Sequence, residues 1–272
     1  MKRFIISLLI CLPAISLSAH AEGIKVSYAY THPEQNMRKA GADITNRYVL
    51  ITNGKISKIY SPRTEYIDSI ESTPEGFERF NTFKRACYEK KQQHLIPRQD
   101  GSFYVTKSFT NKEIMTYDVA SGTRFKWAEP LKRINWEITD SARNILGYEC
   151  FMATTKYHGR KWIAWFAPEI PLNDGPWKMH GLPGLILEAF CEGEQYRFSA
   201  TGIQQSKNVH YDVYSDNNWE PITGNDFWKL RRECLENPSR NLNAGNNSIV
   251  FQGVEYKKYL PKEIVDYIET DY

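Results

Sequence analysis

The chain has 272 residues, and 35 Lys and Arg residues against 32 Asp and Glu residues give it a net charge of only +3. Nucleic-acid binding depends largely on neutralising phosphates, so this balance argues against a nucleic-acid partner. It also predicts no basic patch for a membrane surface.

The first residues have the three parts of a secretory signal peptide. A basic Lys2-Arg3 pair is followed by an apolar run that ends at Leu17, and Ala19-His20-Ala21 forms a small-residue cleavage site. We therefore expect residues 1–21 to be removed and 22–272 to form a single β-rich domain. No later segment is apolar enough for a transmembrane anchor. The predicted location is the periplasm, the outer membrane or the extracellular space.

Strand patterns dominate the first half of the expected mature chain. Residues 26–30 alternate with aromatic side chains, and the runs 48–52 and 55–60 flank Asn53-Gly54. Asn-Gly between two such runs is a strong hairpin signal and predicts a type I′ turn. Short aromatic and β-branched runs predict further strands at 103–109, 112–119, 123–128 and 134–139.

Helical patterns interrupt the strands. Thr73 can cap a helix over 74–92, with Pro74 in its first turn and phenylalanines at near-helical spacing. Asn225 can cap a second helix that ends before Asn237-Pro238. A short third helix is expected near 261–269.

The second half has longer strand patterns, and His158-Gly159 is expected to turn the chain between two of them. The expected fold is mainly β, a strongly curved antiparallel sheet or an incomplete β-barrel, with one to three packed helices, one of them on the concave side. The strands of this half are predicted at 146–155, 160–167, 185–191 and 195–203.

Four cysteines remain after the expected cleavage, Cys87, Cys150, Cys191 and Cys234. An even number in an exported chain fits two disulfides. Strand alternation favours Cys150–Cys191, which leaves Cys87–Cys234 to join the two helices. Four buried thiols are the alternative. The wide spacing contains no C-x-x-C, which argues against a zinc or redox centre.

The segment from Gly175 to Glu188 joins two predicted strands and contains Gly181-Leu182-Pro183-Gly184-Leu185-Ile186. Its glycines and proline specify a backbone path rather than a reaction, so we interpret Gly181, Leu182, Pro183 and Gly184 as a structural loop. This segment, with 159–166 before it, resembles the signature of the GLPGLI family of secreted bacterial proteins. The resemblance implies a location in the cell envelope and no established activity, cofactor or catalytic residue.

Motifs for a catalytic serine, a phosphate-binding loop, a metalloprotease or a dinucleotide are absent from the sequence. No histidine of the mature chain lies three or four residues from another, so we predict no metal site, and no cofactor is expected. His180 is either a ligand-contacting or general-base imidazole, or a loop histidine bonded to a nearby carbonyl. We favour the second interpretation, because no nucleophile or carboxylate accompanies His180 locally.

Aromatic side chains around the signature give the best functional hypothesis. Trp162 and Trp165 lie on opposite faces of one predicted strand, so both faces should be covered. The cover is either the two longer helices, which we favour, or a ligand or partner in an aromatic groove. The groove hypothesis makes Trp162, Trp165, Trp177, Met179 and His180 the predicted ligand-binding residues.

Three functions are compatible with the sequence. The first is a non-enzymatic envelope protein that binds a hydrophobic ligand or a protein partner, and we favour it because catalytic motifs are absent. The second is a hydrolase with a site assembled in space, for which Glu188, Glu192 and Glu194 are candidate carboxylates. The third is a structural or assembly factor of the cell envelope.

Overall fold

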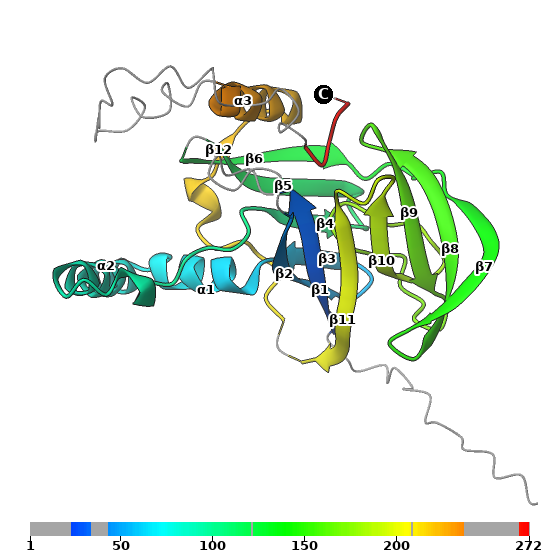
Figure 1. The fold of residues 1–272 in the computed structure, drawn as a ribbon, viewed down its shortest axis with the longest axis horizontal. Coiled ribbons are helices and arrows are strands. Elements are labelled where there is room, and N and C mark those ends of the chain that lie inside the picture. The colour runs from blue at the N-terminus through cyan, green and yellow to red at the C-terminus, as the bar shows by residue number, and fades with distance from the viewer. Residues whose placement is uncertain (1–22, 34–42, 121, 208, 237–266, 272) are drawn as a thin grey trace, which may run out of the picture.

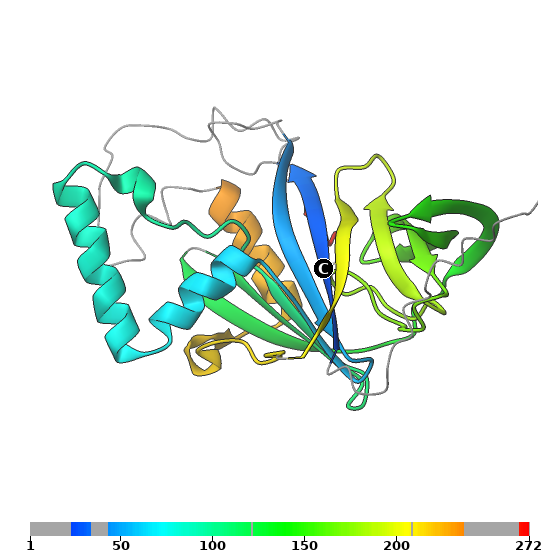
Figure 2. The ribbon, with the colours of Figure 1, turned by 90° about the horizontal axis from the view of Figure 1, so that it is seen from below.

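The computed structural model describes residues 23–33, 43–120, 122–207, 209–236 and 267–271 (Figures 1 and 2). The predicted signal peptide lies outside these ranges, as does most of the helix expected near 261–269, whose described part, 267–269, is not helical. Within the described residues, no helix is both long and apolar enough to cross a membrane.

The described strands form one open sheet of 12 strands, in the order β12-β6-β5-β4-β3-β2-β1-β11-β10-β9-β8-β7. All neighbours are antiparallel except β12 and β6, which are parallel. The sheet is mixed and does not close into a barrel, so the expectation of a mainly β, open curved sheet is confirmed. The strands are β1 (Gly23–Pro33), β2 (Asp43–Thr52), β3 (Ile56–Tyr60), β4 (Tyr104–Ser108), β5 (Glu113–Ala120), β6 (Thr123–Pro130), β7 (Glu137–Ile145), β8 (Tyr148–Tyr157), β9 (Arg160–Ala167), β10 (Leu185–Cys191), β11 (Arg197–Ser206) and β12 (Glu220–Pro221).

Strand β1 joins the two halves of the sheet, because it pairs with β2 on one side and with β11 on the other. Figure 2 shows β1 and β11 between the two halves, with β7, β8 and β9 on one side and the helices on the other. Val26 and Tyr28 of β1 are fully buried in the main core cluster. Strand alternation directs them to one face, as the sequence predicts.

Three α-helices accompany the sheet, α1 (Pro62–Glu71), α2 (Pro74–Glu89) and α3 (Gly224–Glu236), with short 3₁₀ turns η1 (Gln93–Leu95) and η2 (Asp216–Asn218). Thr73 caps α2 as predicted, since its side chain accepts from the Gly76 N–H at 3.1 Å. Helix α1 was not predicted, although Ser61 before Pro62 is the same combination of a capping hydroxyl and a following proline.

The three helices pack in different ways. Helices α1 and α2 project from the body beside β2, and α3 packs on β5 and β6 (Figure 1). The cap of α3 is Thr223, whose hydroxyl accepts from the Asp226 N–H at 3.1 Å, and not Asn225. A threonine one residue before the helix can accept from the first-turn N–H groups, which have no partner within the helix.

Two predicted hairpin turns have different outcomes. His158 (φ 48°) and Gly159 (φ 74°) both have positive φ, as a type I′ turn between β8 and β9 requires. The Asn53-Gly54 hairpin is confirmed, but its turn is not type I′, because only Gly54 has positive φ. The Asn53 side chain instead accepts from the N–H groups of Lys55 (3.0 Å) and Ile56 (2.9 Å), which is an Asx-type turn.

Candidate functional site

The signature segment forms a loop between β9 and β10, and a buried lysine lies inside this loop. Lys107 of β4 donates from Nζ to the carbonyls of Gly175 (2.7 Å), Trp177 (3.1 Å) and Met179 (3.1 Å). The same ammonium lies 2.6 Å from the carboxylate of Asp174, which is also buried. Burial lowers the pKa of Lys107, and Asp174 opposes that shift. The loop is thus organised around a charge from a distant strand.

Four of the five predicted ligand-binding residues lie in the interior. Trp162 and Met179 are fully buried, and Trp177 is 2% exposed. The rings of Trp162 and Trp177 pack at a centroid distance of 5.6 Å. Side chains this deeply buried offer no surface to a ligand, so their role in the described structure is packing.

Each ring nitrogen of His180 faces a backbone carbonyl. Nδ1 lies 2.9 Å from the Lys178 carbonyl and Nε2 lies 3.0 Å from the Lys132 carbonyl. The carbonyl of His180 accepts from Trp136 Nε1 at 2.8 Å. Burial lowers the pKa of the imidazole. The geometry agrees with the favoured interpretation of His180 as a loop histidine, because backbone carbonyls face both sides of its ring and one of them accepts its single N–H.

Trp165 lies on the face of β9 opposite to Trp162, and its side chain is half-buried. The expectation that the two longer helices cover this face is wrong, because α2 packs on α1 and η1, while α3 packs on β5 and β6. The cover is instead the guanidinium of Arg143 from β7, 4.1 Å from the Trp165 ring centroid. A cation over an indole shields the ring while leaving part of it in solvent.

The two signature glycines are required for different reasons. Gly181 has a φ of +91°, which L-residues rarely adopt, and a side chain there would meet mostly open space. Gly184 has no such φ, but its Cβ would overlap the backbone carbonyl of Ala167. Between them, Leu182 is buried and Pro183 is exposed. The interpretation as a structural loop is consistent with this geometry.

The predicted disulfides are not formed, and all four cysteines are thiols. Strand β9 separates the strands of Cys150 and Cys191, and strands two apart lie roughly 9–10 Å from each other. The register also places Cys191 opposite Trp162, which pairs with Thr155, far along β8 from Cys150. A disulfide needs Cα atoms within about 4.4–6.8 Å. The alternation of side chains correctly placed both cysteines on the core face. It could not reveal the order of the strands in the sheet.

The second predicted pair fails because its helices lie apart. Cys87 is on α2 and Cys234 is on α3, and Figures 1 and 2 place these helices in separate parts of the molecule. Cys87 is buried as a thiol. The alternative of buried thiols therefore describes Cys87, Cys150 and Cys191, whereas Cys234 is half-exposed.

The carboxylates considered for a hydrolase are held by basic side chains. Glu188 forms ion pairs with Arg143 and with Arg197, and its Oε1 accepts from Ser199 at 3.1 Å. Glu192 and Glu194 are exposed and form ion pairs too, with Lys161 and Arg197 respectively. Glu192 and Glu194 have the surroundings of solvated surface charges, whereas Glu188 is 7% exposed and is held by its two arginines.

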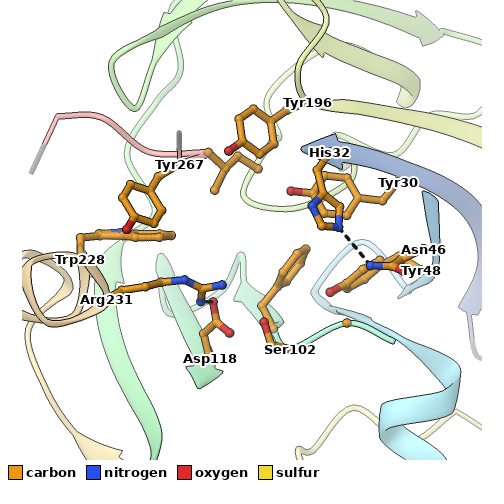
Figure 3. Close-up of a pocket in the computed structure, with 13 residues that line it drawn as sticks. Tyr30, His32, Asn46, Tyr48, Ser102, Asp118, Tyr196, Trp228, Arg231 and Tyr267 are labelled. Carbon is orange, nitrogen blue, oxygen red and sulfur yellow. Dashed lines mark hydrogen bonds and ion pairs between the residues drawn. The ribbon is translucent and has the colours of Figure 1, made fainter. Parts of the chain in front are cut away.

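A pocket of about 170 Å³ opens between the central strands, α3 and the C-terminal segment (Figure 3). We call it the tyrosine pocket. Figure 3 shows aromatic and polar side chains from these elements facing one common space. None of the five residues predicted to bind a ligand lines it. The lining consists of Tyr30, His32, Asn46, Tyr48, Gly101, Ser102, Phe103, Asp118, Tyr196, Trp228, Arg231, Tyr267 and Ile268.

Stacked rings form one wall of the tyrosine pocket. Tyr30 stacks on Phe198 with centroids 4.3 Å apart, and Tyr48 stacks on Phe103 at 4.4 Å. Tyr30 and Tyr48 meet edge to face at 5.5 Å. Burial raises the pKa of both phenols well above the usual value, so both hydroxyls stay neutral donors. The wall is therefore rigid and aromatic, and it carries polar tips.

Charged groups lie at another side of the tyrosine pocket. Arg231 of α3 lies 2.6 Å from the Asp118 carboxylate of β5, so the two charges neutralise each other. Asn46 bonds His32 at 3.0 Å on the opposite side. Among the described residues that line the pocket, Asp118 is the one carboxylate. The surroundings suit a neutral group better than an ion.

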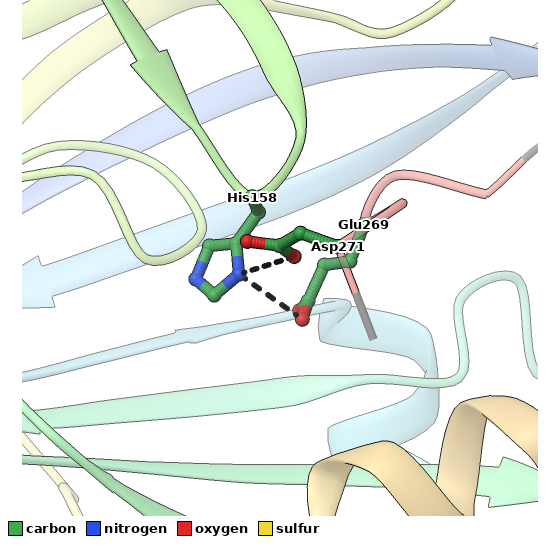
Figure 4. Close-up of side chains that lie close together, drawn as sticks. All are labelled: His158, Glu269 and Asp271. Carbon is green, nitrogen blue, oxygen red and sulfur yellow. Dashed lines mark ion pairs between the residues drawn. The ribbon is translucent and has the colours of Figure 1, made fainter.

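Next to this pocket, the C-terminal segment 267–271 is held by an ionic cluster, of which Figure 4 draws His158, Glu269 and Asp271. Lys178 is fully buried and lies 2.6 Å from Glu129 and 2.7 Å from Glu269. His158 lies between Glu129 (3.5 Å), Glu269 (3.4 Å) and Asp271 (3.4 Å). Burial alone would raise the pKa of Glu129, but His158 and Lys178 hold it at about 2.

The cluster also raises the pKa values of its two bases. Burial opposes the charged form of Lys178, but Glu269 and Glu129 outweigh it and raise the pKa. For His158, burial is likewise outweighed by Glu129 and Glu269. Arg160 adds a bond to the carbonyl of Tyr267 at 2.9 Å. The two residues that precede Glu269 line the tyrosine pocket, so the cluster positions one of its walls.

Sequence reasoning missed Lys107, the tyrosine pocket and the ionic cluster. The alternation of aromatic residues in 26–30 predicted the strand that carries Tyr30, but not its place in a pocket. A lysine at an inward strand position is a usable signal for Lys107. Arg231 and Glu269 give no local signal, because only the tertiary fold brings them to the site.

Residues 157–188 match the model of a family described as a protein of unknown function, Porph_ging. The matched segment begins at the end of β8 and contains β9, the signature loop and the start of β10. It lies where the sequence resembles the GLPGLI signature. The family description carries no activity.

No significant match to a curated protein was found. Among solved structures, the fold is similar to two crystal forms of PNGF-II, with TM-scores of 0.51 and 0.50 and 14% identity. The similarity covers 78% of this chain but only 34% and 33% of PNGF-II, so the chain spans about a third of that protein's length. At this identity the likeness concerns the fold alone, and over residues 157–188 the chain is similar to the Porph_ging family.

Proposed function

We propose that this is an exported, non-enzymatic binding protein of the cell envelope, which takes a neutral, ring-shaped group of its ligand into the tyrosine pocket. The observation that carries the proposal is the pocket itself, with stacked aromatic walls, neutral phenol hydroxyls and an internally neutralised Asp118–Arg231 pair. Apolar walls with a few convergent polar groups are typical of ligand sites.

The size of the pocket limits what enters it. A cavity of roughly 150 Å³ accommodates one benzene molecule, whereas pockets for whole small ligands measure roughly 300–1,000 Å³. A volume of about 170 Å³ therefore suits one ring. We infer that a larger ligand or a partner protein would insert a single ring and leave its remainder outside.

The same residues support binding over carboxylate-based hydrolysis. Glycoside hydrolysis, for example, uses two carboxylates that face each other across the substrate. In the tyrosine pocket the described lining offers one, Asp118, and Arg231 holds it at 2.6 Å. A single carboxylate that is already paired with an arginine does not supply the two opposed groups that this chemistry needs.

Substitutions on two neighbouring residues of β2 can test the proposal. Asn46→Trp should fill the pocket, because Asn46 lines it, whereas Thr45→Trp adds the same side chain on the exposed opposite face. Binding of phenol, indole and glucose at millimolar concentration would be followed by NMR of the aromatic resonances.

We expect at least one of these probes to bind the wild type and Thr45→Trp at the pocket, and not Asn46→Trp. Equal binding to all three proteins, or no shift of any pocket resonance with any probe, would contradict the proposal. Thermal melting of the two variants checks that both are folded.

A further inference from the structure

We propose that His158, Glu269 and Asp271 form a binding site for a divalent transition-metal cation, with zinc as its best fit (Figure 4). The site would join the C-terminal segment to the β8–β9 hairpin. It does not depend on the ligand proposed for the tyrosine pocket. The spacing of histidines along the sequence predicted no metal site, because these ligands come from distant parts of the chain.

The distances between the three side chains suit a shared metal better than direct hydrogen bonds. Nδ1 of His158 lies 3.4 Å from a carboxylate oxygen of Glu269 and 3.4 Å from one of Asp271. Hydrogen bonds to nitrogen usually measure about 2.7–3.2 Å. Tetrahedral zinc with bonds of about 2.0–2.1 Å separates its ligand atoms by about 3.3–3.4 Å. The three ligand atoms all lie within 4.8 Å of one another.

The partners behind these side chains match a second shell. Nε2 of His158 lies 3.5 Å from a carboxylate oxygen of Glu129, so a carboxylate faces the other ring nitrogen at ion-pair distance. Oε2 of Glu269 accepts from Trp228 Nε1 at 3.1 Å. Ligating histidines commonly have a carboxylate on their other nitrogen, and ligating carboxylates are usually hydrogen-bonded.

The backbone brings the ligands together without help from a metal. The N–H of Thr270 donates to the His158 carbonyl at 3.1 Å. Gly159 permits this approach, because a Cβ there would overlap Thr270. The Asp271 side chain is 51% exposed and that of Glu269 only 7%. A cation could therefore enter from the side of Asp271.

The charges at the site favour a cation. The carboxylates of Glu129 and Glu269 contact the ammonium of Lys178, and the carboxylate of Asp271 faces His158. Arg160 bonds the backbone of the segment. With the His158 ring neutral, as metal binding requires, two positive charges against three negative ones leave the cluster net negative. Lys178 faces Oε1 of Glu269, so Oε2 remains directed to His158.

The chemistry of the three side chains determines which metal ions the site favours. One imidazole nitrogen and two carboxylate oxygens suit zinc and its first-row neighbours, whereas calcium and magnesium prefer oxygen ligands throughout. Three protein ligands would leave zinc a fourth position for water.

Calorimetric titration of the full metal-free chain with zinc alone tests the site. We expect one zinc ion per chain, and at least a tenfold loss of affinity in Asp271→Asn. Asp140→Asn is the matched control, since it makes the same change at an exposed carboxylate of β7. Asp271 is half-exposed, so its variant should fold normally. Calcium should bind far more weakly than zinc.

Cobalt substitution gives a readout independent of affinity. Tetrahedral cobalt with a histidine ligand should give strong visible absorption, and His158→Gln should remove it. Failure to bind zinc at micromolar concentrations would overturn the proposal. So would binding that Asp271→Asn and His158→Gln both leave unchanged, or equal affinity for calcium.

Discussion

Lys107 Nζ lies 2.6 Å from Asp174 Oδ1, and both side chains are buried. The pair connects β4 with the signature loop, and three loop carbonyls complete the surroundings of the ammonium. A buried charge is tolerated only when it is paired and hydrogen-bonded in this way. The path of the loop is therefore set by a lysine outside the signature as well as by its own glycines and proline.

Replacing Lys107 with methionine should destabilise the fold by about 3–5 kcal/mol, because Asp174 would remain buried without a counter-charge. Urea unfolding measures the loss. Lys161→Met is the matched control, since Lys161 is half-exposed in a surface ion pair, and should change stability by less than about 0.5 kcal/mol.

A double variant separates charge from packing. Adding Asp174→Asn to Lys107→Met removes the uncompensated carboxylate, so part of the lost stability should return. A double variant that is less stable than Lys107→Met alone would contradict the role of the ion pair.

Gly181 and Gly184 should respond differently to the same substitutions. Gly181→Asn should be tolerated better than Gly181→Ala, because asparagine visits the left-handed region that φ +91° approaches. At Gly184, asparagine should be no better than alanine, since any Cβ overlaps the Ala167 carbonyl. We expect losses of about 1–3 kcal/mol at Gly184. Thermal melting of the four variants checks the pattern, and identical ranking at both positions would refute it.

Local patterns in the sequence predicted much of the fold. Alternation in β9 placed Trp162 and Trp165 on opposite faces, and Thr73-Pro74 marked the start of α2. These signals work because a strand has a period of two and a helix end needs a cap. The open, curved, mainly β sheet follows from the number of such strands.

Long-range relations could not be predicted from the same patterns. The Cys150–Cys191 pairing failed because alternation does not reveal that β9 lies between their strands. The tyrosine pocket combines β1, β2, β5, α3 and the C-terminal segment, which meet only in the tertiary structure. The sequence predicted a ligand site among the aromatic residues near the signature, but Trp162 and Trp177 are buried in the core.

Trp165 and Trp162 should differ in their contribution to stability. Trp162→Ala should cost about 3–5 kcal/mol, because its ring is fully buried. Trp165→Ala should cost less, because its ring is half-buried and loses mainly the Arg143 contact, worth about 0.5–2 kcal/mol. Denaturant unfolding of both variants measures the difference, and a larger loss for Trp165→Ala would show that this face is also core.

Cys150 should resist alkylation in the folded protein. Burial raises the pKa of its thiol to about 11, so at pH 8 roughly one-thousandth of it is the reactive thiolate. We expect mass spectrometry after iodoacetamide treatment to find Cys150 unmodified in the native protein and modified in urea. The native labelling rate should rise about tenfold per pH unit below that pKa. Fast labelling at pH 8, or a non-reduced peptide that links Cys150 to Cys191, would contradict the buried thiol, because the register of β8, β9 and β10 keeps the two cysteines apart.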